Sequence, residues 1–217
     1  MSIFWATSRS ASITGGTVHT LIIDGHPNPD SLCAALARRY ADEHGDAEVL
    51  AVRDLAFDPD MRFGYTRRQE LEPDLERAWL LLLEARHVVV VTPVWWGSVP
   101  AVLKGFFDRV LLPRRAYRTR PNGLPEGLLT GRTGRVIVTS DSPRWYLPLV
   151  GDTTVRHVRR TTLRFCGIRP VRATRLGPVK DSTPERRQAW LAEAGRLGRL
   201  DARRSGAVAA RPEPAAL

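Results

Sequence analysis

The stretch HVVVVTPV, residues 87–94, decides the fold class of this chain. It is a nearly continuous apolar run rich in β-branched valine, which is typical of a strand buried on both faces of a parallel sheet. The run RVIVTS, residues 135–140, has the same character. Weaker apolar runs that complete a set of five expected strands lie at 21–24, 48–52 and 170–176.

Helical patterns separate these runs. They are expected at 31–44, 73–85, 99–112, 153–165 and from the start signal Ser182-Thr183-Pro184-Glu185 to about Arg204. Strand–helix alternation of this kind predicts an α/β, doubly wound, three-layer fold: a five-stranded parallel sheet with helices on both faces. Ligands of such sheets bind beyond the carboxyl ends of the strands. We therefore expect the chemistry in the loops after strands one, three and four.

The 217 residues fit one domain with short extensions. Residues 1–17 are expected to be a flexible N-terminal arm, 18–204 the domain, and the Ala/Pro-rich residues 205–217 a disordered tail. No apolar run approaches the roughly 20 residues that span a bilayer, and the N-terminus lacks a secretion pattern. We expect a cytoplasmic protein without membrane insertion.

The net charge of +10 is unevenly distributed: residues 156–217 hold 15 Lys+Arg and 5 Asp+Glu, and residues 1–155 hold 18 of each. A basic C-terminal third is compatible with binding nucleic acid or phosphate-bearing ligands. An arginine-rich surface is the simpler interpretation, because no aromatic–basic interleaving accompanies it, and no nucleic-acid partner is expected. The histidine and cysteine spacings match no metal site, so none is expected.

The loop after the first expected strand reads GHPNPDSLCAAL, residues 25–36. Asp30 or Ser31 is a candidate N-cap, and the free N–H groups of a helix N-terminus form an anion site. His26 and the Ser31 hydroxyl would add donors to a phosphate. A rigid connection with a capping serine explains the same residues, and the glycine fingerprint of a dinucleotide site is missing. The loop alone leaves both interpretations open.

The loop after the third expected strand contains two adjacent tryptophans, Trp95 and Trp96. Consecutive side chains of an extended chain point in opposite directions. At least one indole should therefore face the ligand crevice, where it suits contact with a planar ring. The other can pack under a neighbouring helix.

The pattern from Pro93 to Val110, PVWWGSVPAVLKGFFDRV, resembles the signature of the NAD(P)H:quinone oxidoreductases of the DT-diaphorase type, which have a flavodoxin-like fold. The loop 25–31 is similar to the flavin phosphate loop of that family, and 151–168 is similar to its late helix and following strand. The resemblance covers roughly residues 19–200. It implies a flavin, FAD with FMN as the alternative, and NADPH or NADH as co-substrate.

The resemblance also implies roles for individual residues. His26, Ser31, Leu32 and Cys33 fall where the family binds the flavin phosphate and ribityl chain, and Pro93, Val94, Trp95, Trp96 and Gly97 fall on the loop lining the flavin ring. Asp108 matches an acidic position near the flavin and the dimer contact, and Thr139 and Ser140 match a hydroxyl pair beside the flavin pyrimidine. Where the family often has two glycines, this chain has Asp141-Ser142 followed by Pro143. Tyr146 matches the tyrosine that assists proton movement, but no histidine lies at the place of its partner, so a proton relay would need Tyr146 alone or water.

The implied activity is hydride transfer from NAD(P)H through flavin N5 to a quinone or similar acceptor, in a ping-pong reaction on one flavin face. Family members are usually homodimers, so a homodimer is expected. An alternative is a regulatory flavoprotein similar to the ancillary subunits of potassium-efflux systems. It would share the fold and the flavin but act mainly by binding a membrane partner.

Overall fold

The computed structural model describes residues 20–142 and 152–209. Within them the chain forms a five-stranded parallel sheet in the order β2-β1-β3-β6-β7. The strands are β1 Thr20–Asp24, β2 Ala47–Ala51, β3 His87–Pro93, β6 Thr133–Thr139 and β7 Val171–Leu176. The α/β fold with its five expected strands is confirmed, and each strand begins and ends within two residues of its expected position.

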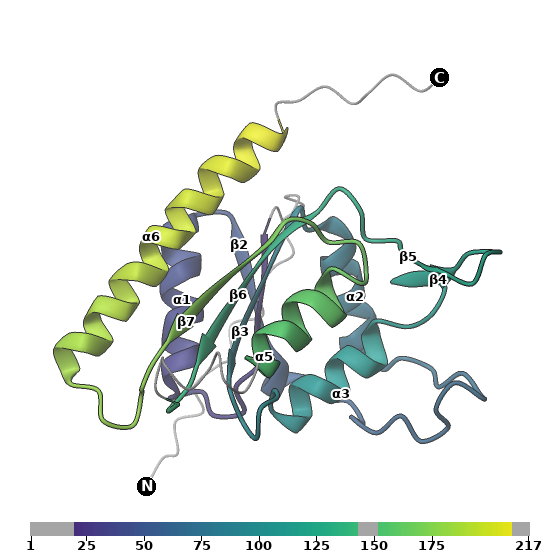
Figure 1. Ribbon diagram of the computed structural model, residues 1–217, viewed down its shortest axis with the longest axis horizontal. Coiled ribbons are helices and arrows are strands. Elements are labelled where there is room, and N and C mark those ends of the chain that lie inside the picture. Colours follow the sequence, from purple (N-terminus) through teal and green to yellow (C-terminus); the bar gives the residue numbers. More distant parts are fainter. Residues whose placement is uncertain (1–19, 143–151, 210–217) are drawn as a thin grey trace, which may run out of the picture.

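Helices cover both faces of the sheet (Figure 1). Helices α1, Leu32–His44, and α6, Pro184–Ala209, pack together on one face. The other face carries α2 (Pro73–Glu84), α3 (Ala101–Val110) and the short α5 (Thr153–Val155), which continues as the π-helix η2 (Arg156–Leu163). A 3₁₀ turn, η1 (Val52–Asp54), follows β2.

Strand β3 lies at the centre of the sheet, and all seven of its residues are buried. Val88 and Val90 pack into the core under α2 and α3, whereas Val89 and Val91 pack into the core under α1 and α6. Because successive side chains of a strand point to opposite faces, both sets must be apolar. This explains the uninterrupted valine run.

The structure corrects the expected pattern in three places. The helix expected over 153–165 is α5 followed by η2, and ends at Leu163. A two-stranded antiparallel hairpin, β4 Tyr117–Thr119 with β5 Pro125–Gly127, was not expected. Helix α6 continues to Ala209, so the first part of the expected disordered tail is helical. The expected arm 1–17 and the remainder of the tail, 210–217, lie outside the described residues.

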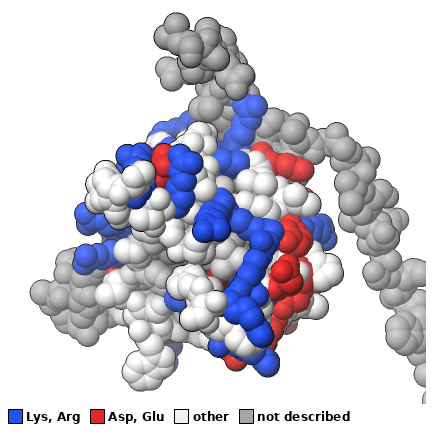
Figure 2. Space-filling model, turned by 90° about the vertical axis from the view of Figure 1, so that its right-hand side faces the viewer, with Lys and Arg blue, Asp and Glu red and all other residues white. Residues whose placement is uncertain are grey.

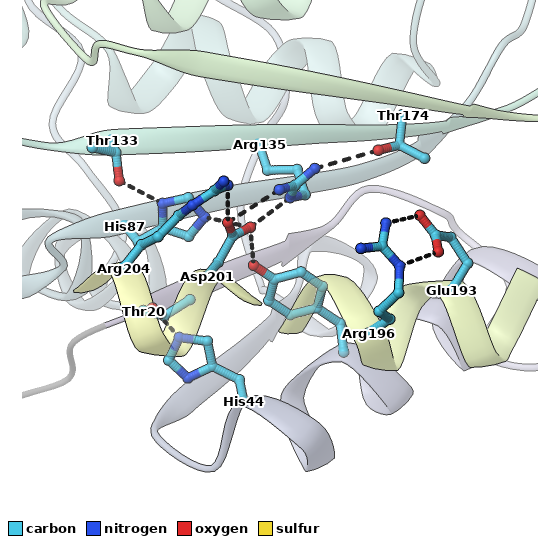
Figure 3. A network of polar contacts seen from close by, with 11 residues as sticks. Thr20, His44, His87, Thr133, Arg135, Thr174, Glu193, Arg196, Asp201 and Arg204 are labelled. Atoms are coloured by element: carbon cyan, nitrogen blue, oxygen red, sulfur yellow. Dashed lines mark hydrogen bonds and ion pairs between the residues drawn. The ribbon is translucent and has the colours of Figure 1, made fainter. Parts of the chain in front are cut away.

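A buried polar cluster joins α6 to the sheet (Figure 3). Arg135 of β6 donates from Nε to Oδ2 of Asp201 over 2.5 Å and from Nη2 to Oδ1 over 3.0 Å. The Tyr40 hydroxyl of α1 donates to the same carboxylate over 2.8 Å. His87 Nε2 lies 3.5 Å from Oδ2, too far for a good hydrogen bond but close enough for charge to act. Burial opposes ionisation of Asp201, yet these partners hold its pKa well below its ordinary value.

No helix among the described residues is long and apolar enough to cross a bilayer.

Candidate functional site

A crevice lies at the carboxyl ends of the strands, where the chain order of the sheet reverses. From β1 the chain continues to β2 on one side, and from β3 it continues to β6 on the other, so the loops after β1 and β3 diverge. The crevice has a volume of about 390 Å³, within the usual range for a small-molecule site. Its lining comes from four loops: His26, Asn28, Ser31, Leu32, Cys33, Pro93, Trp95, Thr139, Ser140, Asp141, Val179, Lys180 and Arg187.

A buried ion pair shapes the loop after β1. Asp24, the last residue of β1, accepts the N–H of His26 over 3.1 Å and a hydrogen bond from Arg53 Nη1 over 2.6 Å. The same Arg53 nitrogen donates to the His26 carbonyl over 3.1 Å. Gly25 is required here, because a Cβ at this position would lie 2.3 Å from the Leu103 side chain. No local sequence pattern marks Asp24 or Arg53 as site residues.

The His26 ring is held in one tautomer by the loop. Its Nδ1 accepts the N–H of Asn28 over 3.0 Å, so in the neutral ring Nε2 carries the proton. Burial lowers the pKa of His26; the charge of Asp24 opposes this effect and that of Arg53 adds to it. The ring is therefore neutral at pH 7. It packs edge-on against Trp95, with ring centroids 5.6 Å apart and planes at 76°.

The N-terminus of α1 faces this crevice. Ser31 is the N-cap, and its Oγ accepts the N–H of Ala34 over 3.1 Å, so its capping role is confirmed. Within the described part of the chain, the N–H groups of Leu32 and Cys33 have no hydrogen-bond acceptor. Such N–H groups at a helix N-terminus are suited to an anion. The same turn thus caps α1 and leaves two N–H donors that suit an anion.

Cys33 lies against the end of β6. Its Sγ is 3.2 Å from Thr139 Oγ1, and both side chains are buried. Burial raises the pKa of the Cys33 thiol to about 12, so the sulfur stays protonated. The Thr139 hydroxyl therefore has a partner within the chain, and the more accessible Ser140 is the better placed of the two hydroxyls to meet a ligand.

The two tryptophans form a tight two-residue turn. Trp95 and Ser98 exchange both backbone hydrogen bonds, each 2.9 Å long. The central residues Trp96 and Gly97 have φ angles of 50° and 71°, as in a type I′ turn. A bulky residue at positive φ is strained. Trp95 lines the crevice, whereas the side chain of Trp96 is fully exposed and belongs to no core.

Helix α5 and its continuation η2 support this turn. The Thr153 hydroxyl donates to the carbonyl of Gly97, and the Thr154 hydroxyl donates to that of Ser98 over 3.2 Å. His157 Nδ1 lies 3.3 Å from Ser98 Oγ. A Cβ at Gly97 would lie 2.9 Å from Thr153 Oγ1, so the turn needs glycine for both its space and its φ angle. We call the turn from Trp95 to Ser98 the aromatic turn. His157, which no sequence pattern placed at the site, is in contact with it.

Eight of the expected site residues share the crevice: His26, Ser31, Leu32, Cys33, Pro93, Trp95, Thr139 and Ser140. Val94, Trp96 and Gly97 belong to the adjoining turn and do not line it. Asp108 is not with them. It pairs with Lys104 over 2.6 Å and lines a separate cavity of about 310 Å³ between α3 and η2. Tyr146, the expected proton donor, lies outside the described residues.

The crevice has cationic residues that the sequence analysis missed. Lys180 and Arg187 line it from the loop after β7 and the start of α6. The Lys180 N–H donates to Asp141 Oδ1 over 2.7 Å, and Arg187 Nε donates to Ser182 Oγ over 2.8 Å. The rule that led to the other loops applies equally here, because β7 is parallel to its neighbours and ends at the same edge. A search of the loop after the fifth strand would have found both residues.

The switch point of the sheet, whose strand order is β2-β1-β3-β6-β7, thus brings several kinds of group together. They are helix N–H groups, cations, a neutral histidine and an indole. These features define a doubly wound α/β protein whose crevice combines anion donors with an aromatic side chain, in the arrangement typical of flavodoxin-like folds. The chain belongs to the family described as having a flavodoxin-like fold, whose profile matches residues 18–197.

Named relatives are similar to parts of this chain. An FMN-dependent NADH:quinone oxidoreductase of Acidovorax ebreus is 34% identical over 122 residues, which cover 55% of each chain. An FMN-dependent NADH:quinone oxidoreductase 1 of Xanthomonas euvesicatoria is 29% identical over 171 residues, or 77% of this chain and 86% of the relative. The chain spans little more than half the length of the first curated relatives it matches. The crystal structure of Smu.1420 from Streptococcus mutans is 28% identical, with a TM-score of 0.77 over 84% of this chain and 99% of that one.

Proposed function

We propose that this chain is an FMN-dependent NAD(P)H oxidoreductase that reduces a quinone or a similar small acceptor. The observation that carries the proposal is the crevice at the switch point, where anion donors and an indole face one space. The relatives named above support it, since both are named as FMN-dependent NADH:quinone oxidoreductases. These names do not support FAD, the first expectation from the sequence, and FMN takes its place.

The residues present fit a flavin mononucleotide. The N–H groups of Leu32 and Cys33 and the Nε2–H of His26 would hold its phosphate, and Lys180 and Arg187 would balance the phosphate charge. At the other end, Pro93 and Trp95 would flank the ring system, with Ser140 beside them. A dianionic phosphate needs donors and positive charge in one place, and this crevice provides both.

When bound, the flavin supplies the hydride chemistry between a nicotinamide and a quinone. The chain supplies position, polarity and shelter from water. The ion pair of Asp24 and Arg53 fixes the loop that carries His26, and Thr153 and Thr154 fix the aromatic turn. Tyr146 stays our proposed proton donor.

The partners and the location follow the same proposal. We propose a homodimer, because large apolar side chains, among them Trp96, Tyr65 and Phe165, are exposed on the single chain. A cytoplasmic location stays a prediction. The regulatory flavoprotein alternative finds no support in the relatives reported above, which are named as oxidoreductases.

The test is direct. Purified protein is mixed with FMN, FAD or riboflavin, and bound flavin is measured by absorbance and identified by chromatography after release. We expect tight binding of FMN, loss of the yellow colour when NADH or NADPH is added without oxygen, and its return when a quinone is added. Protein that takes up no flavin would refute the proposal.

A further inference from the structure

A second cavity, of about 260 Å³, lies on the outer side of η2 beside the edge strand β7. Four arginines of the η2 region and one of β7 line it, together with a single carboxylate and one apolar residue. We call these residues the arginine groove: Asp152, Val155, Arg156, Arg159, Arg160, Arg164 and Arg175. The groove shares no lining residue with the flavin crevice.

The helix concentrates charge on one side. Val158, Thr162 and Leu163 are buried against the sheet, whereas Arg156 and Arg160 are exposed. In a π-helix about 4.4 residues make a turn, so residues four apart lie nearly above one another. Arg156, Arg160 and Arg164 therefore form one row along the groove.

The positive charge of the groove is poorly compensated. Arg175 pairs with Asp152, and Arg159 Nε donates to the carbonyl of Val171 over 2.8 Å. Within the described residues, Arg156, Arg160 and Arg164 have no side-chain hydrogen bond and no ion pair. Like charges held this close repel one another, and a bound anion removes that repulsion.

The other arginine-lined cavity of the chain is different. It has a volume of about 390 Å³ and lies on the side of the molecule that carries the hairpin, where Lys and Arg side chains form a band beside acidic ones (Figure 2). Its Arg109 pairs with Glu72, its Arg115 with Glu76, and its Arg67 stacks on Phe63. Among the described residues, carboxylates pair with three of the five arginines of that cavity but with one of the five in the arginine groove, so the groove is the stronger anion site.

The position of the groove indicates its ligand. Its first residue, Asp152, directly precedes Thr153 and Thr154. The hydroxyls of these threonines donate hydrogen bonds to the carbonyls of Gly97 and Ser98. The groove therefore begins beside the aromatic turn of the flavin crevice and runs away from it along η2. A ligand with one end in the crevice and a phosphate-bearing end outside it would follow this path.

We infer that the arginine groove binds the phosphate-bearing adenosine end of the nicotinamide dinucleotide and prefers the form that carries a 2′-phosphate, NADPH over NADH. This inference rests on the proposed function. Guanidinium groups form paired, charge-assisted hydrogen bonds with phosphate oxygens. Arg156, Arg160 and Arg164 can make such bonds without giving up a partner. The preference goes beyond the names of the relatives, which mention NADH.

The test measures affinity without relying on turnover. Adenosine 2′,5′-bisphosphate and 5′-AMP are titrated calorimetrically into the wild-type protein and into Arg160→Gln and Arg164→Gln. The control is Arg114→Gln, which removes the same charge from the other arginine-lined cavity. We expect the wild-type protein to bind the bisphosphate at least tenfold more tightly than AMP. In each groove variant this ratio of affinities should fall about tenfold, and in the control it should not change.

Activity gives the second measurement. The ratio of kcat/KM for NADPH to that for NADH should fall about tenfold in Arg160→Gln and stay at the wild-type value in Arg114→Gln. Equal affinity for the two nucleotides would overturn the inference, and so would equal losses in the groove and control variants. So would tighter binding of single-stranded DNA than of the bisphosphate.

The two proposals fail in distinguishable ways. A protein that binds FMN and oxidises NADH but shows no preference for the 2′-phosphate overturns the groove and leaves the proposed function standing. A protein that binds no flavin overturns the proposed function and, with it, the dinucleotide as ligand, whatever the groove binds.

Discussion

Arg135 of β6 and Asp201 of α6 are joined by two hydrogen bonds, although they lie far apart in the sequence. Their side chains are almost fully buried, with exposed fractions of 4% and 2%. Removing one partner of such a pair leaves an uncompensated buried charge, which costs more than the pair itself contributes. Asp201 is therefore the polar link between α6 and the sheet, beside the apolar packing of α6 on α1.

Asp201→Asn should therefore destabilise the protein by about 3–5 kcal/mol, measured by urea unfolding. The double variant Arg135→Met/Asp201→Leu should recover part of the loss, because the guanidinium is no longer buried without its carboxylate, although the Tyr40 hydroxyl loses its acceptor. Glu193→Gln is the matched control, since Glu193 forms a similar two-fold pair with Arg196 at the surface (Figure 3). Its urea midpoint should not change. Similar midpoints for Asp201→Asn and the wild-type protein would contradict this account.

Stability should fall as the pH drops below about 6.5. His44 Nδ1 accepts the N–H of Asp46 over 3.3 Å, and Nε2 lies 3.0 Å from Thr20 Oγ1, so the neutral ring is satisfied and the charged ring is not. Burial lowers the pKa of His44 and the charge of His87 adds to this, whereas Asp46 and Asp201 oppose it. The unfolded chain then binds protons first, at the ordinary value of 6.5. The stabilisation that the neutral His44 ring provides is complete above this pH and is lost progressively below it.

The measurement is the free energy of unfolding between pH 8 and pH 5. His44→Gln should be less stable at pH 8 but should lose less stability on acidification. The pKa values of His26 and His157 are also lowered by burial. The slope of the unfolding free energy against pH should therefore become smaller in the variant but not reach zero. An unchanged slope in the variant would show that His44 does not contribute.

Trp96→Gly should show how much backbone strain the aromatic turn stores, separately from any effect on FMN binding. Glycine adopts a φ of 50° without strain, and the exposed indole gives up no burial. The free energy of unfolding should rise by about 1 kcal/mol, while the FMN dissociation constant should stay within about twofold of the wild-type value, because Trp96 does not line the crevice. Trp95→Gly is the comparison, because this indole lines the crevice and packs on His26. A less stable Trp96→Gly protein would show that the positive φ of this turn carries no strain, and a tenfold loss of FMN affinity would show that Trp96 contacts the flavin.

Arg187→Gln should weaken FMN and spare riboflavin, because the two ligands differ only in the phosphate. We expect about a tenfold rise in the dissociation constant for FMN, measured by fluorescence quenching. Arg186→Gln removes the same charge one residue away, where Arg186 stacks over Trp190 instead of lining the crevice. Equal losses for FMN and riboflavin would place Arg187 beside the ring and not at the phosphate.

Both cysteines should resist alkylation in the folded protein. Burial raises the pKa of the Cys33 and Cys166 thiols to about 12 in each case, and the thiolate is the reactive form. Iodoacetamide labelling at pH 8, followed by mass spectrometry, should modify neither until urea is added. Rapid labelling of Cys33 in native protein would show that the crevice opens more than the structure indicates.

Much of the fold is predictable from short-range patterns. The valines of β3 mark a strand buried on both faces, and Ser31 caps its helix as expected. The hairpin was missed because its strands have only three residues each, although Asn122-Gly123 is a turn signal between them. A pattern search over longer windows passes over such short elements.

The site was predictable where a loop follows a strand and not where distant side chains meet. The lining loops of His26 and Trp95 follow from the position of strand ends. The pair of Asp24 with Arg53 and the contact of His157 with Ser98 depend on how separate segments pack. No local spacing contains that information.

The order of synthesis gives the Arg135–Asp201 pair a further consequence. Ribosomes make chains from the N-terminus, so all five strands are synthesised before Asp201. Until Asp201 has been made and has docked, either Arg135 stays hydrated or β6 stays incompletely ordered in the sheet. Docking of α6 therefore closes the sheet face that exposes Arg135, and a chaperone that shields this open face would act before that step.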